Sequence, residues 1–270
     1  MCKSLVFKGR RNAARSARFF AVVLAGVTSL GATLHPIFCV AAHCHPPETH
    51  HVRRVLDGDS LVLDDGRSVR LIGVNAPEYG KDGLANQPLA REARRFLAKL
   101  VQGQCIRLVF EAESRDRYGR VLAHALLSDG ASVEESLIRQ GFAWMVAISP
   151  NVAWTERLAA SEAQARALRR GVWNIPDYRP VAVTALGQLQ SGFRMVEGTV
   201  RHVDQDQNAY YFELSPHISL SISHADWNRY FHGDPVRFLN RRVVVRGWLS
   251  PHRDRLRMRV HHPAMLTFVG

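Results

Sequence analysis

Apolar and polar residues alternate with a period of two from residue 51 onward, and this alternation predicts three short strands. The three segments are residues 51–55, 60–63 and 67–74, and each has the pattern of a strand with one buried face. The turn Asp57-Gly58-Asp59 joins the first two segments, and Asp64-Asp65-Gly66 is a strong hairpin signal between the second and third. We therefore expect this part of the chain to begin with an antiparallel meander.

After Pro88 the period of the apolar residues lengthens to that of a helix. Proline is tolerated in the first turn of a helix, and an apolar face follows it, so a helix is predicted over residues 88–100. The later elements are expected to be strands at 104–110 and 121–127 and helices at 133–140 and 154–169. Five strands with inserted helices indicate a small barrel with a helical flank, and we assign residues 51–176 to this domain.

A second β-rich pattern follows the segment 177–192, which contains Pro180 and Gly187 and is predicted to be a linker. The expected elements are strands at 193–203, 209–214 and 218–223, a helix at 224–231, and strands at 241–249, 256–260 and 265–269. Three strands, a helix and further strands is the order of an OB-type barrel. The predicted fold class is thus mainly β with helices: a five-stranded OB-fold barrel and a second, C-terminal OB-like β-barrel (193–270).

Residues 1–42 have the organisation of a secretory signal peptide. Basic residues precede an apolar run at 19–30, and small residues near the end fit cleavage after Ala41 or Ala42. The apolar run is too short for a comfortable membrane span, although an uncleaved anchor is the alternative. We expect an exported protein, secreted or periplasmic, without stable membrane association after cleavage. Residues 43–50 are predicted to be a linker.

Composition and charge narrow the class of partner. The chain has 270 residues, is 46% hydrophobic and carries a formal net charge of +12, so it is globular rather than disordered. From residue 43 onward, 30 Lys and Arg face 24 Asp and Glu, which leaves +6. A basic surface favours anionic partners, nucleic acid first, and ordinary solubility is the alternative reading.

Cysteine usage is sparse. After signal cleavage only Cys44 and Cys105 would remain, and an exported protein could pair them. Cys105 lies in an apolar predicted strand, so a buried free thiol is the prediction there. The five tryptophans are expected to pack in the core: Trp144, Trp154, Trp173, Trp227 and Trp248.

Five short motifs occur in order between about Val52 and Trp173. They are Asp57-Gly-Asp-Ser60, Arg70-Leu-Ile-Gly-Val-Asn-Ala-Pro-Glu78, Asp116-Arg-Tyr-Gly-Arg120, Leu137-Ile-Arg-Gln-Gly141 and Ser161-Glu-Ala-Gln-Ala165. In order and spacing the sequence resembles the staphylococcal-nuclease-like (thermonuclease) family. The resemblance implies an OB-type barrel with helices and a calcium-dependent phosphodiesterase site. The C-terminal pattern resembles the extra OB-type barrel of some bacterial relatives.

The resemblance assigns roles to eight positions. It implies catalytic roles for Arg70, Glu78 and Arg120 and substrate contacts for Arg117 and Tyr118. It implies metal ligands at Asp59, Asn75 and Ala76, the last through a backbone carbonyl. The family's later tyrosines are replaced near residues 147–149, so that looser substrate contacts are expected.

Asn75 is the departure from the family pattern, which has an acid there. An amide oxygen can still ligate a metal, but the site loses one negative charge, and calcium affinity depends on that charge. The expected cofactor is therefore Ca²⁺, with another divalent metal possible.

The residue types suit phosphodiester hydrolysis independently of the resemblance. Glu78 is a candidate general base, held stiffly by Pro77, and each arginine can offer paired N–H groups to phosphate oxygens. The first hypothesis is an exported metal-dependent endonuclease acting on DNA and/or RNA, with no protein partner evident. The alternative is a catalytically weakened two-OB module that binds nucleic acid.

Strand alternation places Arg255, Arg257 and Arg259 on one face of the second domain. This positive stripe could extend a nucleic-acid groove, and a solvated sheet face is the alternative.

Overall fold

The computed structural model describes residues 49–80, 83, 85–186 and 191–270. The expectations for the signal peptide, its cleavage, Cys44 and most of the first linker lie outside these residues. The first strand, β1 (Thr49–Val55), begins two residues earlier than predicted, inside the expected linker. No helix in the described ranges is long and apolar enough to cross a membrane.

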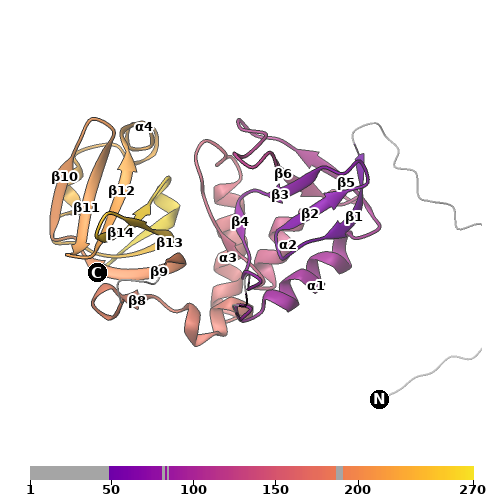
Figure 1. Ribbon diagram of the computed structural model, residues 1–270, viewed down its shortest axis with the longest axis horizontal. Coiled ribbons are helices and arrows are strands. Elements are labelled where there is room, and N and C mark those ends of the chain that lie inside the picture. The colour runs from indigo at the N-terminus through magenta and orange to yellow at the C-terminus, as the bar shows by residue number, and fades with distance from the viewer. Residues whose placement is uncertain (1–48, 81–82, 84, 187–190) are drawn as a thin grey trace, which may run out of the picture. The chain divides into compact units, whose positions relative to one another are not determined.

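The first sheet closes into a barrel in the strand order β1-β2-β3-β6-β5 (Figure 1). Its other strands are β2 (Ser60–Leu63), β3 (Ser68–Leu71), β5 (Cys105–Val109) and β6 (Val121–Leu126). All neighbours are antiparallel except β3 and β6, which run parallel. Alternation fills the interior with apolar side chains, such as Val52, Leu61 and Ile106, none of them exposed. The predicted five-stranded OB-type barrel is confirmed.

Three helices flank this barrel, as expected. They are α1 (Ala90–Val101), α2 (Val133–Arg139) and α3 (Thr155–Ala167). In α1 the side chains of Ala93, Leu97 and Val101 are fully buried, which is the face that the helical period predicts. The Ser132 hydroxyl caps α2 by accepting the Glu135 N–H at 3.1 Å.

Gly141 ends α2 where the chain must pass close to another segment. Its φ is +74°, a conformation that glycine adopts without a Cβ penalty. A Cβ there would lie 2.3 Å from the carbonyl oxygen of Arg170. The glycine therefore permits the end of α2 to pack on the loop after α3.

The predicted strand at 67–74 is divided in the structure. β3 ends at Leu71, and a separate pair of short strands follows, β4 (Val74–Asn75) with β7 (Trp144–Met145). Gly73, at φ +76°, turns the chain between β3 and β4. Periodicity did not predict this break, because the apolar alternation continues across it.

The second sheet has the order β10-β11-β12-β14-β13-β9-β8, with β15 paired to β13. Its bounds are β8 (Val181–Ala182), β9 (Gly192–Thr199), β10 (His202–Gln205), β11 (Ala209–Ser215), β12 (Ile218–Ser223), β13 (Arg242–His252), β14 (Arg255–Arg259) and β15 (Leu266–Val269). Only two residues separate β9 from β10, so one bent segment pairs with β11 through β10 and with β13 through β9, and β8 extends the sheet beyond β9. β12 and β14 are parallel, like β3 and β6. The second OB-like β-barrel is thus also confirmed.

Short helical segments connect these strands. They are η1 (Gly171–Asn174), η2 (Pro176–Tyr178), η3 (Val183–Ala185), α4 (His224–Asp226), the π-helical turn η4 (Trp227–Phe231), η5 (Pro235–Phe238) and η6 (Pro263–Met265). The helix predicted at 224–231 corresponds to α4 and η4 together.

The two barrels share one apolar core. Phe193 of β9 lies between Trp144 of the first barrel and Trp248 of β13, with ring centroids 5.2 and 5.0 Å away. A buried ion pair joins them as well: Arg246 Nη1 lies 2.7 and 2.6 Å from the two carboxylate oxygens of Glu162 on α3.

The prediction of a free thiol at Cys105 is wrong, because Cys105 is disulfide-bonded. Cys105 is only half-buried, and it lies opposite His51 in the ladder between β5 and β1. An apolar strand pattern predicts burial, but it does not show whether another cysteine lies close enough to form a disulfide. The other three cysteines lie outside the described residues.

Candidate active site

A cavity of about 960 Å³ lies at the side of the first barrel and reaches the second. Seven of the eight residues assigned by the resemblance line it: Asp59, Arg70, Asn75, Glu78, Arg117, Tyr118 and Arg120. Ala76 does not line it and is 2% exposed. Residues separated by up to 61 positions in sequence therefore meet around one space because β3 and β6 are neighbours in the barrel.

Asp59 is placed by the turn between β1 and β2. The Asp57 carboxylate accepts the Asp59 N–H at 3.0 Å, which fixes the turn. Gly58 packs so tightly that a Cβ would lie 2.5 Å from the Cβ of Ala76 and 2.8 Å from that of Ala93. This close approach brings the Asp59 carboxylate, only 4% exposed, against the backbone that follows β4.

The Asp59 carboxylate accepts three polar contacts. They come from the Ala76 N–H at 2.8 Å, the Ser60 hydroxyl at 3.0 Å and Arg70 Nη2 at 3.0 Å. Burial nevertheless raises the pKa of the Asp59 carboxyl to about 7, against the opposing effect of Arg70. The charged form is thus incompletely compensated, and additional positive charge would stabilise it.

Arg70 is held by the break between β3 and β4. Its guanidinium donates to the carbonyl oxygens of Leu71 and Val74, the latter at 3.0 Å. Nη2 also lies 3.3 Å from the amide oxygen of Asn75 and contacts Asp59. The carbonyls released by the early end of β3 therefore orient the guanidinium at the wall of the cavity.

Glu78 is exposed and stands at the edge of the cavity. Its loop is closed by two hydrogen bonds with Gln87, since the Glu78 N–H donates to the Gln87 side chain at 2.9 Å and its carbonyl accepts the Gln87 N–H at 3.0 Å. The loop backbone is thus pinned on the side that carries the candidate base.

Arg120 is positioned by Asp116 across a tight turn. Arg120 Nε donates to one carboxylate oxygen of Asp116 at 2.7 Å, and the backbone N–H groups of Tyr118 and Arg120 donate to the other at 2.9 and 3.0 Å. Burial opposes ionisation, but these hydrogen bonds prevail and lower the pKa of Asp116. Asp116 therefore stays charged and aims the guanidinium.

Tyr118 projects from the same turn and is 70% exposed. Arg117 Nη2 donates to its hydroxyl at 2.8 Å, and the Arg120 guanidinium lies 5.8 Å from its ring centroid. An exposed aromatic ring between two arginines is suited to contact a base or sugar beside a phosphate.

Two side chains at the site, Asp59 and Asn75, have oxygen atoms suited to a hard divalent cation. The Asp59 carboxylate and the Asn75 amide supply oxygen, the ligand type that Ca²⁺ prefers, and the raised pKa of Asp59 indicates that positive charge is lacking. Within the described ranges no group of three or more His, Cys, Asp or Glu is arranged to hold a metal. Water, backbone carbonyl or substrate oxygens would have to complete the shell.

Three residues at the cavity were not predicted from the sequence: Asp116, Trp248 and His261. Asp116 begins the motif Asp116-Arg-Tyr-Gly-Arg120, and an Asp four residues before an Arg across a Gly turn is a recognisable signal of such an ion pair. Trp248 and His261 of the second barrel also line the cavity. No local signal could identify them, because they reach it through packing of the two barrels, and Trp248 was expected to be core.

The fold and this cavity define a class: an OB-fold protein whose barrel presents two arginines and carboxylates to one open site. The family model described as staphylococcal nuclease homologue matches residues 68–175. A thermonuclease of Staphylococcus hyicus is 35% identical over 130 residues, covering 47% of this chain and 76% of that protein.

Two further relatives are endonucleases by name. Endonuclease YncB of Bacillus subtilis (strain 168) is 31% identical over 130 residues, 46% of this chain and 61% of its own length. An uncharacterized endonuclease of Escherichia coli is 30% identical over 148 residues, which cover 54% of this chain and 86% of that protein. The chain belongs to the staphylococcal nuclease homologue family and is, at the level of that family, a nuclease.

Proposed function

We propose that this protein is an exported, calcium-type metal-dependent endonuclease that hydrolyses phosphodiester bonds of DNA and/or RNA. The observation that carries the proposal is the convergence of Arg70, Arg120 and Glu78 on one cavity that also contains Asp59 and Asn75. Two guanidiniums beside a carboxylate suit a phosphate whose charge increases during the reaction.

The arginines bind and orient the phosphate. Arg70 is fixed by two backbone carbonyls and Arg120 by Asp116, so neither must be reorganised when substrate arrives. Arg120 presents its two Nη groups to phosphate oxygens, and Arg70 presents Nε, because its Nη groups already contact the protein. A well-placed arginine contributes on the order of 10³-fold in phosphoryl transfer. Tyr118 and Arg117 would contact the adjoining nucleoside.

Glu78 acts as the general base. It is exposed at the cavity edge, where it can accept the proton of a water that attacks phosphorus. Asp59 and Asn75 would hold the metal, with the Ala76 carbonyl as a further assigned ligand, and the bound ion would supply Lewis-acid charge stabilisation and a template.

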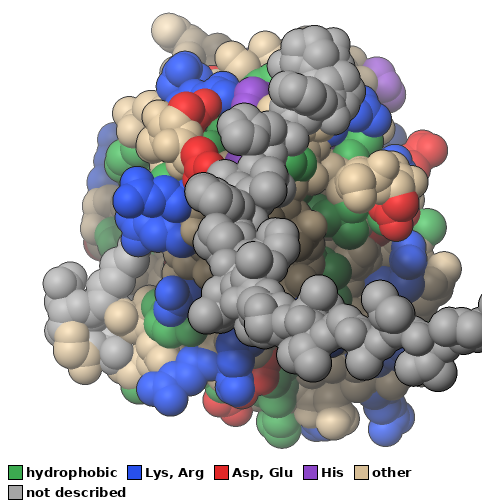
Figure 2. Space-filling model, turned by 90° about the vertical axis from the view of Figure 1, so that its right-hand side faces the viewer, with side chains coloured by type: hydrophobic (Ala, Val, Ile, Leu, Met, Phe, Trp, Pro, Cys, Tyr) green, Lys and Arg blue, Asp and Glu red, His purple; other side chains and the backbone are tan. Residues whose placement is uncertain are grey.

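The surface charge agrees with a polyanionic substrate. From residue 43 onward, 30 Lys and Arg face 24 Asp and Glu, a net charge of +6. On the face drawn in Figure 2, Lys and Arg side chains gather in several places with Asp and Glu between them. Export rests on the resemblance of residues 1–42 to a signal peptide.

The test is cleavage of single-stranded DNA by the purified protein with calcium, with other divalent ions and with chelator. Glu78→Gln should lower kcat by roughly 10²- to 10⁴-fold because the water loses its proton acceptor. Glu92→Gln is the matched control, since Glu92 is an exposed carboxylate on α1 that pairs with Arg95. Full activity in Glu78→Gln, or equal activity in chelator, would overturn the proposal.

The second candidate is a two-barrel binding module with weakened hydrolysis, favoured by the amide at Asn75. It predicts salt-sensitive binding of single strands without cleavage in any divalent ion. Metal-dependent cleavage excludes it.

A further inference from the structure

Two further cavities continue the candidate active site onto the second barrel. A cavity of about 310 Å³ shares Ile148, Trp248 and His261 with the first. A third, of about 760 Å³, shares His252 and Arg257 with the second. Cavities that share lining residues lie next to one another, and together these three mark a path from Arg70 and Glu78 to the face of the second barrel.

The charge along the middle of this path suits a polyanion. Arg257 and Arg259, on one face of β14, line the second cavity together with His252 and His261. Among the described residues that line it there is no Asp or Glu. Arg257 Nε is buried and has no hydrogen-bond partner, so this donor is not committed to the protein. Two guanidiniums in such a setting attract phosphate.

Arg255 contributes less to this path than the sequence predicted. Its guanidinium forms an ion pair with Glu213, and the third cavity, which it lines, also contains Asp204 and Asp206. The positive stripe is therefore concentrated on Arg257 and Arg259, the end nearest the candidate active site.

Aromatic rings stand at both junctions of the path. Trp248 is half-buried, packs edge-to-face on Phe193 at 5.0 Å, and lines both the first and the second cavity. At the far junction the Arg257 guanidinium lies 4.6 Å from the ring centroid of Tyr211. Alternation of aromatic rings with cationic groups is how OB-type barrels hold single strands, because every base offers a face for stacking.

The path is fixed before any ligand arrives. The Glu162–Arg246 pair is buried, and the Ala147 N–H lies 3.2 Å from Met265 Sδ across the same interface. A preset groove costs little ordering when it binds.

We propose that a single strand of nucleic acid runs from the candidate active site across Trp248 and along β14, with Arg257 and Arg259 on its phosphates. This inference rests on the proposed nuclease function and specifies its substrate: a single-stranded segment longer than the reacting site alone requires.

The test measures binding of fluorescent single-stranded DNA by anisotropy, in Glu78→Gln protein so that substrate survives. Oligonucleotides of about 4 and about 16 nucleotides span the range of one OB-type site. Affinity should rise at least about tenfold with length in this background, and Arg257→Ser/Arg259→Ser should lose most of that gain. The slope of log K against log salt for the longer strand should become shallower by about 1.4, for two lost phosphate contacts.

The matched control is Arg201→Ser/Arg229→Ser, which removes two exposed arginines of the same barrel that line none of the three cavities. It should keep the length dependence. Retention of the full length gain and slope by Arg257→Ser/Arg259→Ser, an equal loss in the control, or no length gain in the background protein would overturn the inference. Failure of the proposed function is separate: it shows as no cleavage of either oligonucleotide by the wild-type protein in any divalent ion.

Discussion

Three side chains that line the cavity, Asp59, Arg70 and Asn75, contact one another. Arg70 Nη2 contacts both Asp59 and Asn75, the two side chains proposed to hold a metal. The guanidinium supplies part of the positive charge that an ion would provide, and burial still leaves the pKa of Asp59 raised to about 7. A bound cation would therefore stabilise the charged form of Asp59, and the contacts of Arg70 hold the side chains of Asp59 and Asn75 in place without it.

Restoring an acid at position 75 should act in opposite directions on affinity and stability. Asn75→Asp adds a carboxylate beside Asp59, so calcium affinity should rise by about tenfold or more. The side chain at position 75 is buried, since Asn75 is 1% exposed. In the metal-free protein a second buried carboxylate should therefore lower the free energy of unfolding. Calorimetric titration and urea unfolding measure the two effects. A variant with unchanged affinity would argue that residue 75 is not a ligand.

Calcium binding should release protons below neutral pH. The folded-state pKa of Asp59 is about 7, whereas an unperturbed Asp is near 4, so the apo protein carries a proton there at pH 6 that an ion must displace. Between about pH 4 and pH 7 the metal-free protein loses stability as pH rises, because the native state binds more protons than the unfolded state. Titration calorimetry at pH 6 in two buffers of different ionisation enthalpy measures the release. No release at pH 6, with binding intact, would contradict the role of Asp59.

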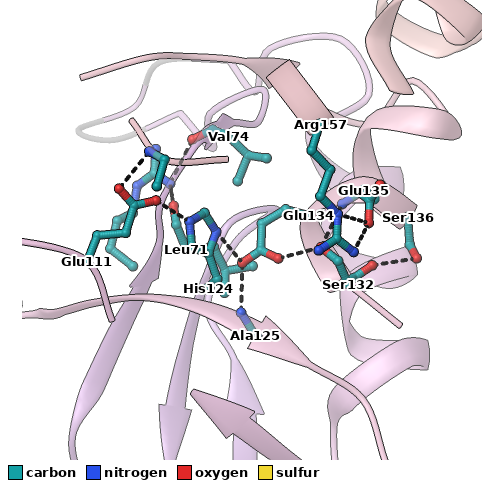
Figure 3. Close-up of polar contacts among 12 residues, drawn as sticks. Leu71, Val74, Glu111, His124, Ala125, Ser132, Glu134, Glu135, Ser136 and Arg157 are labelled. Atoms are coloured by element: carbon teal, nitrogen blue, oxygen red, sulfur yellow. Dashed lines mark hydrogen bonds and ion pairs between the residues drawn. The ribbon is translucent and has the colours of Figure 1, made fainter. Parts of the chain in front are cut away.

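At the scale of elements, a buried polar network joins β6 to α2 and the loop before α3 (Figure 3). His124 Nε2 lies 2.7 Å from a carboxylate oxygen of Glu111, and Nδ1 lies 3.7 Å from Glu134. Glu134 also accepts the Ala125 N–H at 2.8 Å, and the ring of Trp154 stacks on His124 at 3.8 Å. The network thus links α2 and the residue before α3 to the barrel strand β6.

Replacing His124 by leucine should lower the free energy of unfolding by about 3 kcal/mol, because Glu111 and Glu134 lose a buried partner. Urea unfolding measures it. His217→Leu, at an exposed position, is the control and should change stability by less than about 0.5 kcal/mol. A His124 variant as stable as this control would show that the network contributes no net stability.

Periodicity and turn signals predicted both barrels and the three main helices, because one buried face per element leaves a period in the sequence. The order of strands followed from the OB-type pattern. The early end of β3 was not predicted, since Gly73 interrupts the strand within a continuous apolar pattern. Trp248 and His261 at the cavity could not be predicted, because their place depends on how the barrels pack.

At the scale of the whole molecule, the buried Glu162–Arg246 ion pair is one of the contacts that join the two barrels. Glu162 also accepts the Met145 N–H at 2.8 Å, so one carboxylate serves α3, β7 and β13. Both side chains are more than nine-tenths buried. The pair fixes geometry, and its net stability is a balance between attraction and desolvation.

Arg246→Leu should destabilise the protein by about 3–5 kcal/mol, because Glu162 is left buried without its partner. Adding Glu162→Met should recover part of this loss, since neither charge is then buried alone. Urea unfolding of the two variants measures the difference. A double variant less stable than Arg246→Leu would contradict the argument.

The closed first barrel and the short end strands of the second sheet have a consequence for behaviour at high concentration. Every strand of the first barrel is paired on both sides, and the strands that end the second sheet, β8, β10 and β15, have only two, four and four residues. Long unpaired edges are what neighbouring molecules use to add strands to one another. Within its described part, the folded chain therefore offers little template for edge-to-edge aggregation.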